Sequence, residues 1–289
     1  MKFGVCIVWY NPGQAQLDSI NNIVNSNYTI AIIDNSNEAN TNLFSKIERE
    51  NVMYIHNKNK GGIAGAFNIG AKAIFGDASI SYFFTMDQDS EIDDAFFISM
   101  VKFTQKRNAL LACPNFFDRN AKTYGTFVKL KDWSYSISTD GTSHFCISSG
   151  MCITREAWGI IGTFNEELII DHVDTDYALR AYVKKIPIYV NYEQCLNHAI
   201  GEREKRKFLG VTFKPNHHSY IRKYYIVRNG TYLSLKYLSY AKGYFFLNIM
   251  RLIHEFGSVI FFEKDKSRKL KYMLKAVYDS FKGKLGAIK

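Results

Sequence analysis

The sequence has no internal repeat and no low-complexity segment, and its five cysteines are scattered and odd in number. Most of these cysteines lie inside apolar runs, which is typical of reduced cytosolic thiols and not of a disulfide framework. The first ten residues contain neither a long apolar stretch nor a small-residue cleavage site, so no signal peptide is expected. A run of about 18 uncharged apolar residues is also lacking, since Arg251, His254 and Glu255 interrupt the stretch 244–262. We therefore expect a cytoplasmic protein without a membrane-spanning helix.

Positive charge is concentrated in the last third of the chain. Residues 201–289 hold 20 Lys and Arg against 6 Asp and Glu, a formal charge of +14, whereas residues 1–200 hold 17 against 21, a formal charge of −4. Such a basic block indicates an anionic partner. Because it adjoins the aromatic stretch 244–262, it predicts a helix lying on an anionic bilayer, with a buried helix and a basic tail as the alternative. No helix-turn-helix, zinc-finger or RNP pattern supports nucleic acid binding.

Short apolar runs alternate with helical patterns through the first 115 residues. The runs at 5–9, 28–33, 51–56 and 80–86 are predicted to be strands. This alternation predicts a Rossmann-like α/β fold, with a mostly parallel sheet flanked by helices. We expect a catalytic domain at 1–215 and a helical, basic extension at 216–289. Ligands of such sheets bind beyond the carboxyl ends of the strands, where polar clusters stand in this sequence.

Two acidic residues, Asp87 and Asp89, follow the apolar run at 82–86. Carboxylates on either side of one residue can hold Mg²⁺ or Mn²⁺, whose remaining positions take phosphate oxygens and water. An Asp-x-Asp pair is more often a solvated turn, but its place at the end of a buried strand favours a metal site. His198 ends another apolar run and is a candidate third ligand, or else an ordinary surface or core histidine.

The segment 59–70 is rich in glycine and alanine. Gly61 and Gly62 predict a tight turn that lets the backbone approach a ligand, followed by a helix whose first N–H groups are free. Packing of that helix against the sheet could also explain the small residues. Asn68, a polar residue among them, fits a ligand contact better than a core position.

Three carboxylates, those of Asp171, Asp174 and Asp176, are crowded together. They are not all comfortably ionised unless a cation or a substrate hydroxyl faces some of them. One of them could remove the proton from an acceptor hydroxyl as it attacks. The simpler interpretation is a helix N-terminus whose dipole attracts acidic residues, and both interpretations stay open.

The order of these motifs resembles glycosyltransferase family 2, whose members are inverting enzymes of the GT-A fold, and is most similar to the bacterial rhamnosyltransferase branch. The similarity covers about residues 3–235, and several motifs in order are far more specific than any one alone. They are the segments 8–12 (VWYNP), 33–35 (IDN), 59–68 (NKGGIAGAFN), 87–90 (DQDS), 148–150 (SSG), 170–176 (IDHVDTD), 198–201 (HAIG) and 222–229 (RKYYIVRN).

The resemblance implies a role for each matching residue. The nucleotide-binding set would be Tyr10, Pro12, Asp34, Asn35, Gly61, Gly62, Asn68 and Asp87. The metal ligands would be Asp87, Asp89 and His198, and the acceptor side would comprise Ser149, Gly150 and Asp176. Asp174 matches the family's catalytic base. The residue before it is usually acidic but here is Val173, which leaves Asp171 as a rival.

The resemblance thus implies a metal-dependent enzyme that moves one sugar, with dTDP-rhamnose as the first choice of donor, to an acceptor hydroxyl in surface polysaccharide or O-antigen biosynthesis. The implied acceptor is a saccharide or is polyprenyl-diphosphate-linked and met at the inner face of the cell membrane, and a homodimer is left open. The alternative donors are UDP-galactose, UDP-galactofuranose and UDP-GlcNAc. A nucleotidyltransferase fits less well, because the loop 10–13 lacks Arg and Lys. The hypothesis requires that residues 89 and 174 share one cleft.

Overall fold

The computed structural model describes the backbone of residues 2–21, 23, 28–47, 50–90, 93–118, 122–198, 206–208 and 210–288 and, apart from residues 198, 208 and 211, their side chains. The elements up to residue 118 are β1 (Lys2–Trp9), α1 (Gln14–Asn21), β2 (Thr29–Asp34), α2 (Thr41–Phe44), β3 (Val52–His56), α3 (Gly62–Phe75), β4 (Ile80–Asp87), α4 (Asp94–Lys106) and β5 (Leu111–Asp118). They are followed by β6 (Thr123–Tyr124), β7 (Val128–Leu130), β8 (Tyr135–Ile137), β9 (Thr142–Ser143), β10 (Met151–Thr154), α5 (Arg155–Ile161), the 3₁₀ helix η1 (Glu166–Leu168), α6 (Val173–Val183) and β11 (Ile188–His198). The last elements are β12 (Arg206–Phe208), β13 (Val211–Phe213), α7 (Tyr220–Lys236), α8 (Lys242–Phe262) and α9 (Lys266–Phe281).

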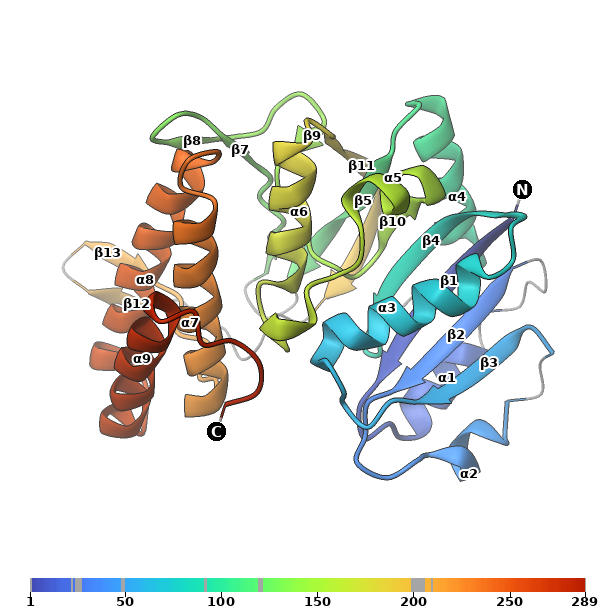
Figure 1. Cartoon of the computed structure of the whole chain (residues 1–289), viewed down its shortest axis with the longest axis horizontal. Coiled ribbons are helices and arrows are strands. Elements are labelled where there is room, and N and C mark those ends of the chain that lie inside the picture. Colours follow the sequence, from blue (N-terminus) through green and yellow to red (C-terminus); the bar gives the residue numbers. More distant parts are fainter. Residues whose placement is uncertain are drawn as a thin grey trace.

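One large sheet runs through the first two thirds of the chain (Figure 1). Its strand order is β3-β2-β1-β4-β10-β5-β11-β9, with β6 paired to β5. The pairs β1–β2, β2–β3, β1–β4 and β5–β11 are parallel, whereas β10 lies antiparallel between β4 and β5. The predicted mostly parallel sheet is therefore confirmed, with an antiparallel strand at its centre.

Helices cover both faces of this sheet, because its central strands are buried on both sides. In β1, Cys6 and Val8 belong to the core that α3 covers, whereas Val5 and Ile7 belong to the core that α1 and α4 cover. Strands buried on both faces carry continuous apolar runs, as β1 does. All five cysteines, each in the described part of the chain, are free.

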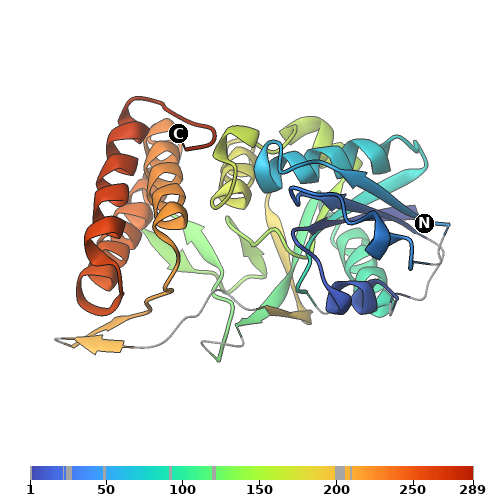
Figure 2. The ribbon, with the colours of Figure 1, turned by 90° about the horizontal axis from the view of Figure 1, so that it is seen from below.

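Helices α7, α8 and α9 pack together at one end of the molecule, beside α6 (Figures 1 and 2). α7 is buried on two sides: Leu233 and Tyr237 belong to the main core, whereas Tyr224 and Val227 pack against residues of α8 and α9. The C-terminal helices thus share the core of the sheet, and the boundary at 215 stays a prediction.

Ion pairs hold the three helices together inside this layer. The ammonium of Lys223, fully buried, lies 2.7 Å from Glu255 Oε2 and 2.7 Å from Glu263 Oε1. Lys269 Nζ lies 2.7 Å from the other oxygen of Glu263. Buried charges persist where they are paired and hydrogen-bonded, so part of the basic block serves packing.

Within the described residues, α8 is the one helix that is long and apolar enough to cross a membrane. Its mean hydropathy is 1.4, and 22% of the apolar window is buried inside the protein. This result rests on length and composition alone. The sequence analysis expected no membrane-spanning helix here, because charged residues interrupt the same stretch. In the structure, α8 packs against both α7 and α9.

Candidate active site

Two of the predicted site residues stand at the carboxyl edge of the parallel strands. β1 lies between β2 and β4, with Trp9 opposite Asp34 and Val8 opposite Asp87. Because the three strands are parallel, Asp34 and Asp87 end neighbouring strands on either side of β1. Both residues therefore lie at the edge of the sheet where the sequence analysis expects a ligand.

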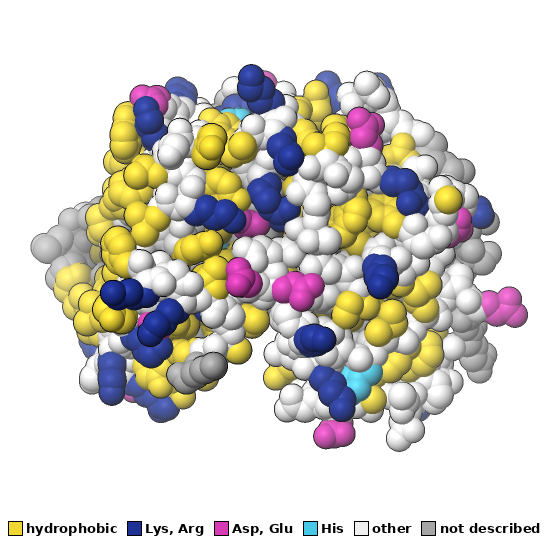
Figure 3. All heavy atoms as spheres, viewed as in Figure 1, with side chains coloured by type: hydrophobic (Ala, Val, Ile, Leu, Met, Phe, Trp, Pro, Cys, Tyr) yellow, Lys and Arg dark blue, Asp and Glu magenta, His cyan; other side chains and the backbone are white. Residues whose placement is uncertain are grey.

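The charges of three carboxylates interact at the end of β4. Asp87 is half-buried and Asp89 is exposed. Burial, followed by the negative charges of Asp89 and Asp174, raises the pKa of Asp87 to about 7, and the positive charge of Arg222 opposes the rise. The fold thus brings residues 87, 89 and 174 near enough for their charges to interact. Figure 3 shows a notch in the surface between the C-terminal helices and the rest of the chain.

Asp171 and Asp174 differ in what they contact. Asp171 Oδ1 lies 3.3 Å from Arg222 Nη2 in an ion pair. Asp174 accepts a hydrogen bond at Oδ1 from the N–H of Thr175 at 2.6 Å, and its Oδ2 has no partner among the described residues. Burial raises the pKa of both carboxyls, and the charge of Asp171 adds to the rise at Asp174. A raised pKa and a free oxygen favour Asp174 as the proton acceptor.

The turn at 148–150 lies against the end of β4. The N–H of Gly150 donates to the carbonyl of Thr85 at 2.8 Å, and Ser149 Oγ lies 2.6 Å from Ser90 Oγ. Gly150 has a φ of 78°, and a Cβ there would approach Leu196 to 2.7 Å. The turn therefore borders the carboxylates, but Ser149 is fully buried and supports the strand. An acceptor contact through Ser149 or Gly150 stays a prediction.

Gln88 joins the end of β4 to the end of β1. The N–H of Tyr10 donates to Gln88 Oε1 at 2.7 Å, and Gln88 Nε2 donates to the carbonyl of Tyr10 at 3.2 Å. The Tyr10 side chain is 50% exposed and Pro12 is half-buried, so both are accessible as the predicted lining of a base pocket. Only the place of Gln88 between two aspartates could have suggested its role.

Asp34, predicted to bind the nucleoside, is buried and bonded within the protein. Its carboxylate accepts hydrogen bonds from Ser36 N at 2.9 Å, Asn40 N at 3.0 Å and the Tyr54 hydroxyl at 2.5 Å. Burial alone would raise its pKa, but these hydrogen bonds lower it below the ordinary value. Asp34 therefore shapes the loop after β2, and its contact with a nucleotide stays a prediction.

Asn35 is also buried, and it connects that loop to the glycine turn. Its Nδ2 donates to the carbonyl of Gly62 at 3.0 Å, and its Oδ1 accepts from Asn57 Nδ2 at 2.7 Å. Both ends of the amide are therefore engaged. A nucleotide contact by Asn35 stays a prediction.

The glycine turn packs against protein where a ligand was expected. A Cβ on Gly61 would lie 2.6 Å from Glu166 Oε2, and one on Gly62 would lie 1.9 Å from the carbonyl oxygen of Ile169. The N–H of Ile63, in the first turn of α3, donates to that same carbonyl at 2.9 Å. The close approach of Glu166 and Ile169 thus requires glycine at both positions. The N–H of Ile63 was expected to be free, but it is hydrogen-bonded.

Two further predicted site residues, Asn68 and Asp176, are bonded inside the protein. Asn68 donates to the carbonyl of Phe164 at 3.0 Å and accepts from its N–H at 2.8 Å. Asp176 is fully buried and accepts from Arg180 at 2.9 Å and Tyr237 at 3.0 Å. Asn68 therefore holds a turn, and a ligand contact by Asn68 stays a prediction. In this conformation the Asp176 carboxylate is closed to an acceptor.

The predicted metal ligands are placed only in part. The side chain of His198 lies outside the described residues, and in the described part of the chain no three His, Cys, Asp or Glu side chains form a group that could hold an ion. Asp87 and Asp89 remain as a pair of hard oxygen donors. Burial and, next, the negative charge of Asp89 raise the pKa of Asp87, and a divalent cation would offset this negative charge.

Two arginines from the C-terminal helices act on the carboxylates. Arg222 on α7 pairs with Asp171, and the charge of Arg251 on α8 opposes the rise in the pKa of Asp174. Arg222 stood in a motif without an assigned role, and Arg251 counted only as a break in an apolar stretch. Spacing along the chain carries no signal for either, because tertiary packing brings α7 and α8 to the sheet.

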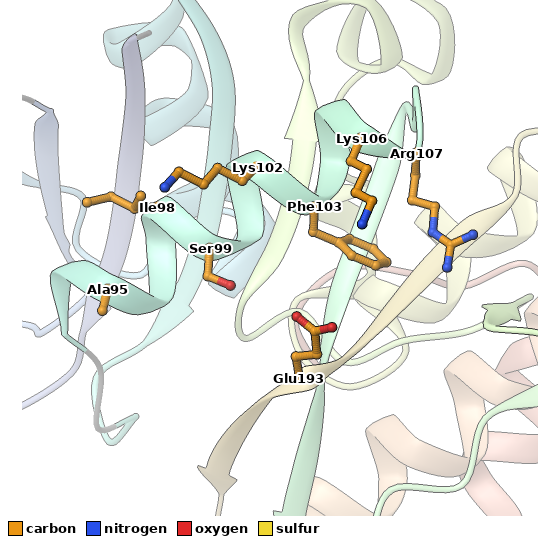
Figure 4. Close-up of a pocket in the computed structure, with 8 residues that line it drawn as sticks. All are labelled: Ala95, Ile98, Ser99, Lys102, Phe103, Lys106, Arg107 and Glu193. Carbon is orange, nitrogen blue, oxygen red and sulfur yellow. The ribbon is translucent and has the colours of Figure 1, made fainter.

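A surface cavity of about 550 Å³ lies on α4 (Figure 4). It is lined by Ala95, Ile98, Ser99, Lys102, Phe103, Lys106, Arg107 and Glu193. Its three basic side chains are all exposed, and none of the carboxylates at the end of β4 lines it. The cavity is therefore separate from the candidate site.

The fold and the acidic sheet edge define this protein as a glycosyltransferase of the GT-A class. Residues 4–168 match the family described as Glycosyl transferase family 2, and the chain belongs to that family. It is 32% identical over 244 residues to "dTDP-rhamnosyl transferase RfbF" of Shigella flexneri, covering 80% of this chain and 79% of that protein.

Solved structures share this fold at low sequence identity. Residues 1–349 of S. aureus TarS in complex with UDP-GlcNAc give a TM-score of 0.61 at 15% identity, covering 98% of this chain and 81% of that one. GalNAc-T7 with UDP, GalNAc and Mn²⁺ gives a TM-score of 0.60 at 14% identity and 98% coverage, although this chain spans only 56% of that one. These similarities establish the fold alone.

Gly62→Ala is expected to destabilise the protein, because its Cβ would overlap the Ile169 carbonyl at 1.9 Å and its φ is +61°. The backbone conformation alone would cost about 1–3 kcal/mol for a residue other than glycine. Gly159→Ala in α5 is the matched control, since a Cβ there meets nothing within 4 Å, and it should stabilise by up to about 1 kcal/mol. Urea unfolding measures both. Equal stability of Gly62→Ala and wild type would contradict the close approach.

Proposed function

We propose that this protein transfers rhamnose from dTDP-rhamnose to a hydroxyl group of an acceptor in surface polysaccharide or O-antigen biosynthesis. The proposal depends most on one observation, the convergence of Asp87, Asp89 and Asp174 at the carboxyl edge of the sheet. The identity of 32% to a dTDP-rhamnosyl transferase supports the choice of donor.

In the proposed reaction, Asp174 accepts the proton of the acceptor hydroxyl. The acceptor oxygen forms a bond to the anomeric carbon of the donor, the bond from that carbon to the diphosphate oxygen breaks, and the nucleoside diphosphate leaves with the electron pair. A single displacement inverts the configuration at the anomeric carbon. Asp171 stays paired with Arg222, which leaves Asp174 as the free base.

Asp87 and Asp89 would hold Mg²⁺ or Mn²⁺, with His198 as the predicted third ligand. When bound, the cation supplies positive charge that stabilises the leaving diphosphate. The hydrogen bonds between Gln88 and Tyr10 fix this acidic pair relative to the predicted base pocket. The chain itself can thus orient a nucleoside diphosphate between the ends of β1 and β4.

A UDP-sugar is the alternative donor, because the TarS and GalNAc-T7 structures contain UDP-GlcNAc and UDP. The two candidates share the diphosphate and differ in the base and the sugar. Direct comparison of donors in solution therefore decides between them.

Binding of dTDP-rhamnose with Mn²⁺ is expected to raise the Tm of the protein more than UDP-galactose or UDP-GlcNAc does. A ligand at 100 times its Kd stabilises by about 2.7 kcal/mol, which corresponds to a rise of several degrees. Asp89→Asn should remove the Mn²⁺-dependent part of the rise, as should EDTA, because the substitution removes a metal ligand. A wild-type protein whose Tm responds to no nucleotide sugar would contradict the proposal.

Asp174→Asn is expected to lower kcat by about 100- to 10,000-fold, the usual contribution of a general base. The amide has the same shape, so the donor-induced rise in Tm should persist. Asp171→Asn is the matched control and should retain far more activity, because Asp171 is already paired with Arg222. Sugar transfer by each variant measures this. An active Asp174→Asn beside an inactive Asp171→Asn would reverse the assignment of the base.

We also infer that the C-terminal helices hold the enzyme on an anionic membrane surface, where a polyprenyl-diphosphate-linked acceptor would be met. Apolar residues recur at helical spacing on the outer face of α8 and are exposed: Phe246 40%, Ile249 37%, Met250 46% and Ile253 61%. A basic cluster follows at 264–271. Figure 3 shows hydrophobic and basic side chains side by side over the C-terminal helices. The homodimer left open by the sequence stays a prediction.

Ile253→Glu is expected to weaken binding to vesicles that contain phosphatidylglycerol. Burial of one isoleucine contributes about 1.5–3 kcal/mol, so affinity should fall at least about tenfold. Ile160→Glu is the matched control, since Ile160 is 42% exposed but lies on α5. Vesicle co-sedimentation measures both, with phosphatidylcholine vesicles for comparison. Wild-type protein that ignores the anionic vesicles would contradict the inference.

A further inference from the structure

Apart from Arg222, which pairs with Asp171, the motif at 222–229 has no part in the proposed chemistry, yet it faces the segment that carries the candidate bases. The motif lies in α7, and Arg222, Tyr225 and Asn229 recur every three or four residues, so they share one face of the helix. Residues 167–172, which directly precede α6 and Asp174, are called the base loop here. Side chains of α7 contact both a side chain and the backbone carbonyls of the base loop.

Asn229 is fully buried, and its amide nitrogen faces three carbonyl groups of the base loop. Nδ2 lies 2.9 Å from the oxygen of Leu168, 2.8 Å from that of Ile170 and 2.9 Å from that of Asp171. The nitrogen carries two hydrogens, so the three carbonyls share them. If the amide were rotated by half a turn, Oδ1 would face the three carbonyl oxygens and could donate to none of them. The three carbonyls therefore set the orientation of the amide.

Arg228, 1% exposed, secures that orientation. Its Nε donates to Asn229 Oδ1 at 2.8 Å. Its Nη2 lies 3.2 Å from the carbonyl of Glu167 and 3.3 Å from that of Leu168, and its Nη1 donates to the carbonyl of Gly286 at 2.6 Å. The planar guanidinium fork therefore connects Asn229, the base loop and the C-terminal end of the chain.

The base loop has a backbone conformation that its residues do not favour. Ile169, Asp171 and His172 have φ values of 66°, 59° and 62°, in a region that is rare for residues other than glycine and most unusual for a β-branched one. The conformation of each such residue costs about 1–3 kcal/mol and persists only where contacts with the surrounding structure hold it in place. The carbonyls that Asn229 binds belong to this same stretch, so α7 supplies some of the contacts that hold this conformation.

Two other parts of the chain enclose the base loop. The N–H of Ile63 donates to the carbonyl of Ile169 at 2.9 Å, and the N–H of Gly286 donates to the carbonyl of Glu167 at 2.7 Å. Figures 1 and 2 both show the C-terminal end beside α7 and the beginning of α6. The loop is thus held by the glycine turn, by α7 and by the C-terminal end.

We propose that Arg228 and Asn229 are positioning residues, which hold the base loop in its left-handed conformation and thereby set Asp174 relative to Asp87. The inference rests on the proposed function, because it takes Asp174 as the base. Loss of these contacts would misplace the base without removing a group predicted to touch the donor. A displacement of about 1 Å can lower a rate about 100-fold.

Asn229→Ala tests the proposal. We expect kcat to fall about 100-fold and the KM for the donor to change little, because Tyr10, Asp87 and Asp89 are unaltered. Hydrogen–deuterium exchange of peptides that span the base loop should become faster, while exchange in β1 and β4 stays unchanged. Arg228→Lys keeps the charge but loses the fork, so it should lower kcat with the same unchanged KM.

Ser234→Ala is the matched control, because Ser234 lies on the same helix and is 3% exposed. It loses the hydrogen bond of 2.9 Å that Ser234 donates to the carbonyl of Thr231 and the one of 3.3 Å that it accepts from Asn248, and neither bond involves the base loop. This variant should lower the Tm and leave kcat unchanged. A kcat of Asn229→Ala equal to wild type, at a temperature where both are folded, would overturn the proposal, as would an equal loss of kcat in Ser234→Ala.

The proposal stays testable if a variant does not fold or if the wild type transfers no sugar. If Asn229→Ala does not fold, the same measurements on Arg228→Lys decide, and unchanged kcat and exchange in that variant overturn the proposal. If the wild type transfers no sugar from any donor, the proposed function fails. Exchange then tests the holding role by itself: faster exchange confined to the base loop supports it, and unchanged exchange refutes it.

Discussion

The partial burial of like negative charges at one edge of the sheet shapes much of this structure. Asp87, Asp89 and Asp174 come together there, and the pKa of Asp87 rises to about 7 as a result of burial and their charges. Positive charge must offset such a cluster. The C-terminal helices bring Arg222 and Arg251 to it, which gives a structural reason why an acidic first part of the chain is joined to a basic last part.

Rigid support for this edge comes from residues that first suggested ligand contacts. The glycine turn, Asn35 and Asn68 each bond or closely approach another segment of the protein. Small residues let backbones approach each other as readily as they let a backbone approach a ligand, and sequence alone does not distinguish the two. At Gly62 the approaching backbone is that of the base loop, through Ile169, so this glycine acts on the site through the loop that it contacts.

The sheet and the family were predictable because they depend on local signals. Apolar runs such as β1 and ordered motifs such as 87–90 are read directly along the chain. The antiparallel β10 at the centre of the sheet was not predicted, since nothing local specifies its neighbours β4 and β5. The pairing of Asp176 was not predicted for a related reason: its partner Tyr237 directly follows α7, and a carboxylate that is buried and satisfied looks in the sequence like one facing a substrate.

The sequence by itself determined the alternation of strands and helices, the position of the acidic residues at strand ends and the membership of glycosyltransferase family 2. These follow from periodicity and from short motifs, which neighbouring residues impose. Tertiary packing is what pairs Asp171 with Arg222, whereas Asp174 Oδ2 has no partner in the part of the chain that the structure describes. Pairing and burial arise when distant segments pack, and the distances between packed side chains are not written in their order along the chain.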